Sequence, residues 1–157
     1  MYKRQNLFDV NLNKNEKYLE SKNYMAGKKL VVSDLLWGKL GMSICYDLRF
    51  PNLYRKLTKK GAQFFSIPAA FTFTTGKAHW HSLIRARAIE NGCFVFAPAQ
   101  CGVHDNGRRT YGHSMIVNPW GKILVEAKKN KKQIISTIIN IDEIGHSRKK
   151  IPSMTQF

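Results

Sequence analysis

A cysteine at the end of a short β-prone run is the clearest candidate for chemistry in this chain. Cys45 closes the run 40–45, and Pro51 stands where a helix is predicted to begin. Arg49 and the first amides of that helix favour a thiolate, and backbone N–H groups after the strand favour a developing oxyanion. The pattern predicts a cysteine nucleophile. A buried, unreactive thiol is the alternative reading of any isolated cysteine.

The other cysteines and the histidines do not predict a metal site. Cys93 and Cys101 have no CxxC spacing, and the odd count of three cysteines argues against a disulfide framework and favours the reducing cytoplasm. His79 and His81 are two residues apart, so on one helix they point to nearly opposite sides. If the helix begins after His81, the pair lies instead in a loop beside the pocket. We therefore expect no bound metal.

The charge raises the question of nucleic acid. Lys and Arg number 26 against 10 acidic residues, a formal net charge of +16. Most of the cations are lysines spread along the chain, and no zinc-finger, RNA-recognition or basic-zipper pattern is present. A solvated lysine-rich surface is the simpler interpretation. The alternative function is a catalytically silent basic module that binds nucleic acid or an acidic partner through residues 128–132 and the lysines of the tail.

Length and patterning predict one layered α/β domain. The chain has 157 residues, 43% of them hydrophobic, and no apolar run long enough for a membrane span. We expect no secretory signal. Gly and Pro punctuation predicts helices at 51–61 and 77–91, the second closed by Gly92. Residues 1–30 and 100–111 are expected to be loops. Strands are predicted at 30–32, 40–45, 64–67, 93–97, 114–117, 122–125 and 134–141.

The segment around Cys45 resembles a known family. Residues 41–51, Gly-Met-Ser-Ile-Cys-Tyr-Asp-Leu-Arg-Phe-Pro, are similar to the nucleophile segment of the nitrilase, or carbon–nitrogen hydrolase, superfamily. The closest resemblance is to the branch of Nit proteins and omega-amidases. Further similar segments follow in the family's order, and they cover essentially the whole chain: residues 7–10, 20–27, 79–91, 99–100, 112–114, 118–121 and 148–152.

The resemblance implies an α-β-β-α sandwich enzyme with a Glu-Lys-Cys catalytic set and no metal or organic cofactor. The cysteine attacks the carbon of a small amide, or of a nitrile, and water then releases the acid. The position of the catalytic lysine falls on Arg4, which can stabilise an oxyanion but does not share its proton. Carried over to this sequence, the catalytic residues are Cys45, Arg4 and Glu20, and the substrate-binding residues are Tyr46, Asp47, Arg49 and Phe71.

Members of this family are longer, and the chain begins near their catalytic lysine. We therefore expect residues 1–157 to be the C-terminal portion of a single hydrolase domain, without the N-terminal strands and helix and without the catalytic glutamate. Such a chain is expected to be impaired or inactive by itself. Its expected partners are a small amide, a second copy or a complementary N-terminal chain.

Overall fold

A six-stranded mixed sheet forms the centre of the protein, whose computed structural model describes residues 5–14, 16–128 and 131–155. The strand order is β10-β9-β6-β5-β4-β3, with β4, β5 and β6 parallel and the remaining neighbours antiparallel. The strands are β3 (Val32–Leu35), β4 (Gly38–Met42), β5 (Phe64–Ser66), β6 (Phe94–Ala97), β9 (Met115–Val117) and β10 (Ile123–Glu126). The predicted mixed α/β domain is confirmed.

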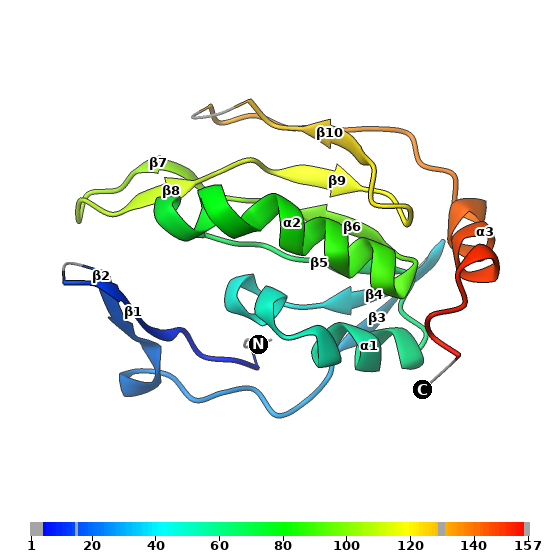
Figure 1. Cartoon of the computed structure of the whole chain (residues 1–157), viewed down its shortest axis with the longest axis horizontal. Coiled ribbons are helices and arrows are strands. Elements are labelled where there is room, and N and C mark those ends of the chain that lie inside the picture. The colour runs from blue at the N-terminus through cyan, green and yellow to red at the C-terminus, as the bar shows by residue number, and fades with distance from the viewer. Residues whose placement is uncertain (1–4, 15, 129–130, 156–157) are drawn as a thin grey trace.

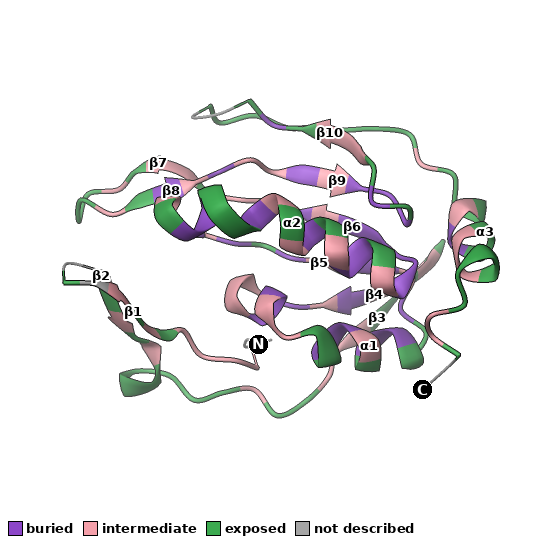
Figure 2. Cartoon of the chain, viewed as in Figure 1, coloured by how far each residue is buried: buried purple, intermediate pink, exposed green. Residues whose placement is uncertain are grey.

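Two helices, α1 (Pro51–Lys59) and α2 (Phe73–Asn91), lie side by side across one face of this sheet (Figure 1). Strand side chains alternate between the two faces, and those that point toward the helices form the main core with them. Figure 2 shows the buried positions concentrated between these helices and the strands. Among its large, fully buried side chains are Trp80, Tyr54, Phe65, Leu57 and Ile84.

Local sequence sets the ends of both helices. Pro51 occupies the first turn of α1, as predicted. The Thr72 hydroxyl accepts a hydrogen bond from the N–H of Thr75, so α2 begins four residues before the predicted start. Gly92 ends α2 in the left-handed conformation, with φ of 55°. No helix in the described part of the chain is long and apolar enough to cross a lipid bilayer.

The opposite face of the sheet is covered much less completely. Phe64 and Phe94 are buried there beneath Ile144 of α3 (Asp142–Lys150). The predicted strand 134–141 is wrong: residues 131–140 form neither helix nor strand, and Ile134 and Ile138 are 98% and 96% exposed. A run rich in isoleucine and threonine is typical of a strand, but a strand also needs a neighbour for its backbone groups, and β10 has none on its outer side among the described strands.

Two small hairpins occupy segments that we predicted to be loops. In the first, β1 (Asp9–Asn13) pairs with β2 (Glu16–Leu19), and a short 3-10 turn (Glu20–Lys22) follows. In the second, β7 (Cys101–Val103) pairs with β8 (Arg109–Tyr111). A bridge between Thr72 and Thr110 ties β8 to the start of α2. The loop predictions were wrong because polar composition does not exclude a short hairpin.

Candidate active site

Cys45 lies at a strained bend just beyond the sheet. β4 ends at Met42, Ile44 is still extended, and Cys45 begins a short 3-10 turn (Cys45–Arg49) with φ of 49°. A side chain with Cβ rarely adopts such a positive φ, and strain of this kind occurs mainly at functional sites. The bend is fixed by the Cys45 N–H, which donates to the carbonyl of Pro68 over 2.9 Å.

The carboxylate of Asp47 holds the bend from within. Asp47 is fully buried, and its oxygens accept hydrogen bonds from the backbone N–H groups of Ile44 (3.0 Å), Asn6 (2.9 Å) and Gln5 (3.1 Å). The predicted contact of Asp47 with substrate is not what its geometry favours, because the carboxylate is occupied by backbone donors. The backbone N–H of Asp47 donates to the carbonyl of Ile44. This N–H and that of Cys45 therefore have partners within the chain and are not open to an oxyanion.

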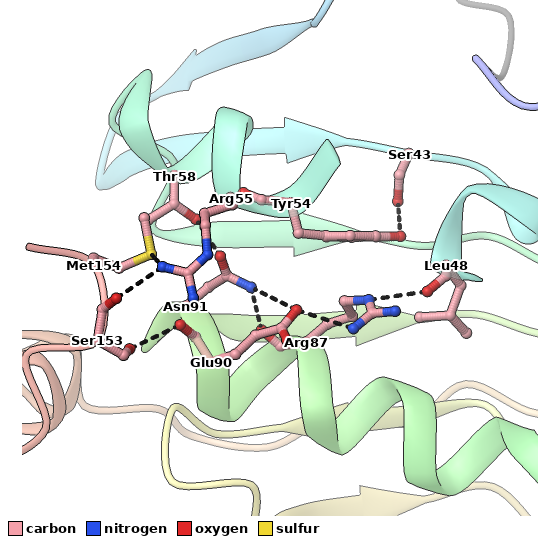
Figure 3. Close-up of polar contacts among 10 residues, drawn as sticks. All are labelled: Ser43, Leu48, Tyr54, Arg55, Thr58, Arg87, Glu90, Asn91, Ser153 and Met154. Atoms are coloured by element: carbon pink, nitrogen blue, oxygen red, sulfur yellow. Dashed lines mark hydrogen bonds and ion pairs between the residues drawn. The ribbon is translucent and has the colours of Figure 1, made fainter. Parts of the chain in front are cut away.

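Helices α1 and α2 support the bend from behind, as Figure 3 shows. Ser43, just before the bend, shares a 2.8 Å hydrogen bond with the hydroxyl of Tyr54 on α1. The guanidinium of Arg87 on α2 donates to the carbonyl of Leu48 over 2.9 Å and pairs with Glu90 over 3.0 Å. The backbone on both sides of Cys45 is therefore anchored to the helical layer.

Cys45 opens onto two adjoining cavities. The first, here called the outer cavity, has a volume of about 570 Å³. Its walls are mostly small and apolar, with polar groups from Gln100, Ser114, Gln133 and Arg108. The second, here called the aromatic cavity, has a volume of only about 10 Å³. It is lined by Phe8, Cys45, Tyr46, Arg49, Ala70, Phe71, Thr72, Thr75 and Arg108. The outer cavity therefore has room for a substrate at the thiol, whereas the aromatic cavity has room for about one water molecule.

Three of the predicted substrate-binding residues, Tyr46, Arg49 and Phe71, meet in the aromatic cavity. The guanidinium carbon of Arg49 lies 5.2 Å from the centre of the Phe71 ring and 6.0 Å from that of Tyr46. Its Nη1 is 3.2 Å from Nδ1 of His79 on α2. Burial lowers the pKa of Arg49, and the acidic groups of Tyr46 and Cys45 act in the opposite direction. A partly desolvated cation thus faces the cavity beside the thiol.

Glu20, the second predicted catalytic residue, does not line either cavity. Glu20 accepts a 2.8 Å hydrogen bond from the N–H of Phe8, whose ring packs edge-on against Tyr46. Neither Glu20 nor Asp47 is among the residues that line the two cavities, so in this structure Glu20 reaches the site through Phe8. Arg4 lies outside the described residues.

Arg108 is a site residue that sequence reasoning missed. It lines both cavities, and its Nη2 donates to the carbonyl of Ala70 over 2.6 Å. Its buried Nε has no hydrogen-bond partner within the described structure. The sequence offered no signal for it, since it lies in a stretch that we predicted to be a plain loop.

The two histidines of α2 contact different residues. Both lie within the helix, so the alternative that they share a loop beside the pocket is wrong. His79 contacts Arg49, and Nε2 of His81 is 3.0 Å from Oε1 of Glu126. As predicted from their spacing, the two rings do not converge on one point.

A family model described as carbon–nitrogen hydrolase matches residues 1–149. Because the match spans nearly the whole chain, the chain belongs to the carbon–nitrogen hydrolase family. Similarity to Nit proteins places it in the Nit branch of the nitrilase superfamily.

Three similar proteins show the extent of this likeness. The deaminated glutathione amidase of Synechocystis sp. is 48% identical over 155 residues, which are 98% of this chain and 57% of that protein. The crystal structure of the Caenorhabditis elegans NitFhit protein matches with a TM-score of 0.88 and 39% identity, over 99% of this chain and 38% of that one. A mutant amidase from Nesterenkonia sp. AN1 matches with a TM-score of 0.67 and 26% identity, over 80% of this chain and 44% of that one. It carries the acetamide moiety of fluoroacetamide on its active site cysteine. The chain thus spans about half the length of these relatives.

Proposed function

We propose that this chain carries the nucleophile of an amide hydrolase and that Cys45 is that nucleophile. The thiol sulfur bonds to the amide carbon, the C–N bond breaks, and the thiol proton leaves with the amine. Water then attacks the thioester, and the acid and the free thiol are released. The observation that carries the proposal is the position of Cys45, strained at the bend between two cavities and beside the Arg49 guanidinium. The covalent adduct of the Nesterenkonia amidase supports the same chemistry.

The substrate class is proposed from Arg49, whose half-buried guanidinium lies beside Cys45. It stands among the aromatic rings of Phe8, Tyr46 and Phe71, with Arg108 as a second guanidinium in the same wall. A guanidinium in such a setting binds carboxylate strongly, because it offers paired N–H donors where water competes poorly. We therefore propose that the acyl part of the amide bears a carboxylate. Deaminated glutathione, the substrate in the name of the Synechocystis relative, is the first compound to test.

The outer cavity is proposed to hold the body of the substrate, because Cys45 lines it and its volume of about 570 Å³ is enough for a small amide. Arg108, which also lines it, is placed to contact the substrate. Positioning by Glu20, oxyanion stabilisation by Arg4, a single hydrolase domain over 1–157, a second copy or complementary chain as partner, and a cytoplasmic setting all stay predictions.

The test is to trap the acyl group on the purified chain. The chain is incubated with deaminated glutathione, or with an activated ester of the acid that its hydrolysis releases, and is then quenched with acid. Peptide mass spectrometry should locate the acyl group on Cys45. The matched control is Cys101→Ala, which removes the other half-buried thiol and should leave labelling unchanged. Equal labelling of Cys101, or labelling that persists in Cys45→Ala, would refute the proposal.

A second variant tests the substrate class. Arg49→Met should weaken the binding of a carboxylate-bearing amide about tenfold or more, since a hydrogen bond to a charged group contributes about 1.5–3 kcal/mol. It should affect a neutral amide of the same size much less. Equal losses for the two amides would show that Arg49 does not bind a carboxylate. The alternative of a silent basic module predicts instead that Cys45→Ala changes nothing and that binding falls steeply with salt.

A further inference from the structure

Three ligand-type side chains from distant parts of the chain converge outside the cavities around Cys45. They are His81 on α2, His113 between β8 and β9, and Glu126 at the end of β10. Oε1 of Glu126 lies 2.5 Å from Nδ1 of His113 and 3.0 Å from Nε2 of His81. All three ligand atoms lie within 4.8 Å of one another. We propose that this cluster is a binding site for a divalent transition-metal ion of the zinc type.

The donor set selects the kind of ion. Two imidazole nitrogens and one carboxylate oxygen suit zinc and the other late first-row transition metals, whereas magnesium and calcium prefer oxygen ligands alone. Zinc bonds to such atoms at about 2.0–2.2 Å, so ligand atoms of a tetrahedral site stand about 3.3 Å apart. The separations of 2.5 Å and 3.0 Å from Oε1 of Glu126 would have to grow by less than about 1 Å to reach that value. The two histidine nitrogens, which lie within 4.8 Å of each other, would have to stand at about the same distance.

Metal binding competes with the hydrogen bonds of the cluster. Nδ1 of His113 and Nε2 of His81 both face Oε1 of Glu126, and because an ionised carboxylate only accepts hydrogen bonds, each of these nitrogens donates. A metal needs the lone pair of that same nitrogen, so each ring that binds an ion gives up the proton at that position, either to its other ring nitrogen or to solvent.

The surroundings hold His113 in place before any ion arrives. Its backbone has φ of 60°, and its carbonyl accepts a 2.8 Å hydrogen bond from Nε1 of Trp80. Its ring stacks on Tyr111, with 4.3 Å between centroids and 25° between planes. Such supporting contacts fix the orientation of a metal-binding histidine and raise its affinity.

Glu126 is also held by its neighbours, because the N–H of the next residue, Ala127, donates to the carbonyl of Ser114 over 2.8 Å. The side chains of His81, Glu126 and His113 are 33%, 31% and 19% exposed. A fourth ligand position is therefore open to water. None of the three residues lines either cavity around Cys45, so the ion would join α2 to the β8–β9 connection and to β10 rather than take part in the reaction.

The experiment is a titration of the purified, chelator-treated chain with Co²⁺, which absorbs visible light characteristically when it is tetrahedrally bound, followed by displacement with Zn²⁺. We expect one ion per chain and an unfolding temperature that rises with Zn²⁺ and falls again with chelator. Glu126→Gln, which keeps the side-chain shape, should weaken binding about tenfold or more, as should His81→Ala. The matched control is His146→Ala, because His146 is an exposed histidine on α3 outside the cluster.

Each outcome decides the proposal. Binding that is lost in Glu126→Gln and His81→Ala but kept in His146→Ala supports the site, provided that circular dichroism shows the variants to be folded. If the unaltered chain takes up no Co²⁺, or if Glu126→Gln binds as tightly as the unaltered chain, the cluster is only a hydrogen-bonded triad. Equal loss in His146→Ala would indicate adventitious binding by surface histidines and would equally overturn the proposal.

Discussion

Gly76 allows α2 to approach β8 closely, and replacing it with alanine tests how tightly the two elements pack. A Cβ at Gly76 would lie 2.3 Å from Cβ and 2.5 Å from Cγ of Tyr111. Carbon atoms in contact normally stand about 3.5–4.0 Å apart, so the helix and the strand would have to separate by about 1 Å. Gly76→Ala is therefore an overpacking mutation in a helix that alanine would otherwise favour.

The magnitude follows from two opposing effects. Alanine in place of glycine stabilises a helix interior by about 1 kcal/mol. Overpacking of a close contact costs about 1–3 kcal/mol and occasionally more, and here the obstacle is next to the Tyr111 backbone and cannot easily rotate away. Because the obstacle is rigid we take the upper end of that cost, about 3 kcal/mol, and expect net destabilisation of about 2 kcal/mol, which lowers the unfolding temperature by a few degrees in a domain of this size.

Gly145→Ala is the matched control. Gly145 lies in α3, and nothing stands within 4 Å of its would-be Cβ. The same chemical change should there stabilise the chain by about 0.5–1 kcal/mol. Urea unfolding followed by circular dichroism measures both variants. If Gly76→Ala were as stable as Gly145→Ala, the close packing of α2 against β8 would be wrong.

Two further predictions use the titrating groups. Burial raises the pKa of Cys93, and the neighbouring Arg148 only partly offsets this, so thiol reagents at pH 8 should modify Cys93 only after unfolding; modification of the native chain at Cys93 would contradict its buried position. Burial raises the pKa of Glu126, but the interactions with His113 and His81 lower it by more than burial raises it, so the pKa lies below its usual value. A carboxylate with a lowered pKa stabilises the fold above its unfolded pKa and loses that effect as the pH falls through the folded value. The unaltered chain should therefore lose more stability than Glu126→Gln between about pH 5 and pH 3; equal losses measured by thermal unfolding would refute the ionised triad.

Sequence reasoning succeeded where local chemistry fixes structure. Pro51 and Gly92 marked helix ends because their backbone preferences do not depend on distant residues. The hairpin of β9 and β10 followed from the turn residues 118–121 between two apolar runs. Cys45 was placed correctly between a strand and a helix, although the strand ends at Met42 and not at Cys45 as predicted.

Apart from the two local hairpins, whose polar composition was interpreted as loop, the failures concern interactions between distant segments. The isoleucine-rich run 134–141 predicted a strand, but β-prone residues do not reveal whether a neighbouring strand is present. Asp47 was expected to face substrate, whereas its oxygens bind amides about forty residues away in sequence. The cluster of His81, His113 and Glu126 arises only when α2 and β10 are packed around the β8–β9 connection. None of these relations leaves a mark at short sequence spacing.

The uncovered isoleucines have a consequence for the behaviour of the chain in solution. Ile134 and Ile138 expose apolar surface on an extended segment, the kind of feature by which separate molecules associate and aggregate. Lys128, Lys131 and Lys132 stand just before them, also exposed, and the chain as a whole carries a formal net charge of +16. Like charges repel at low ionic strength, but added salt screens them and leaves the apolar attraction intact. The tendency of separate chains to associate through this segment therefore depends on the salt concentration of the buffer.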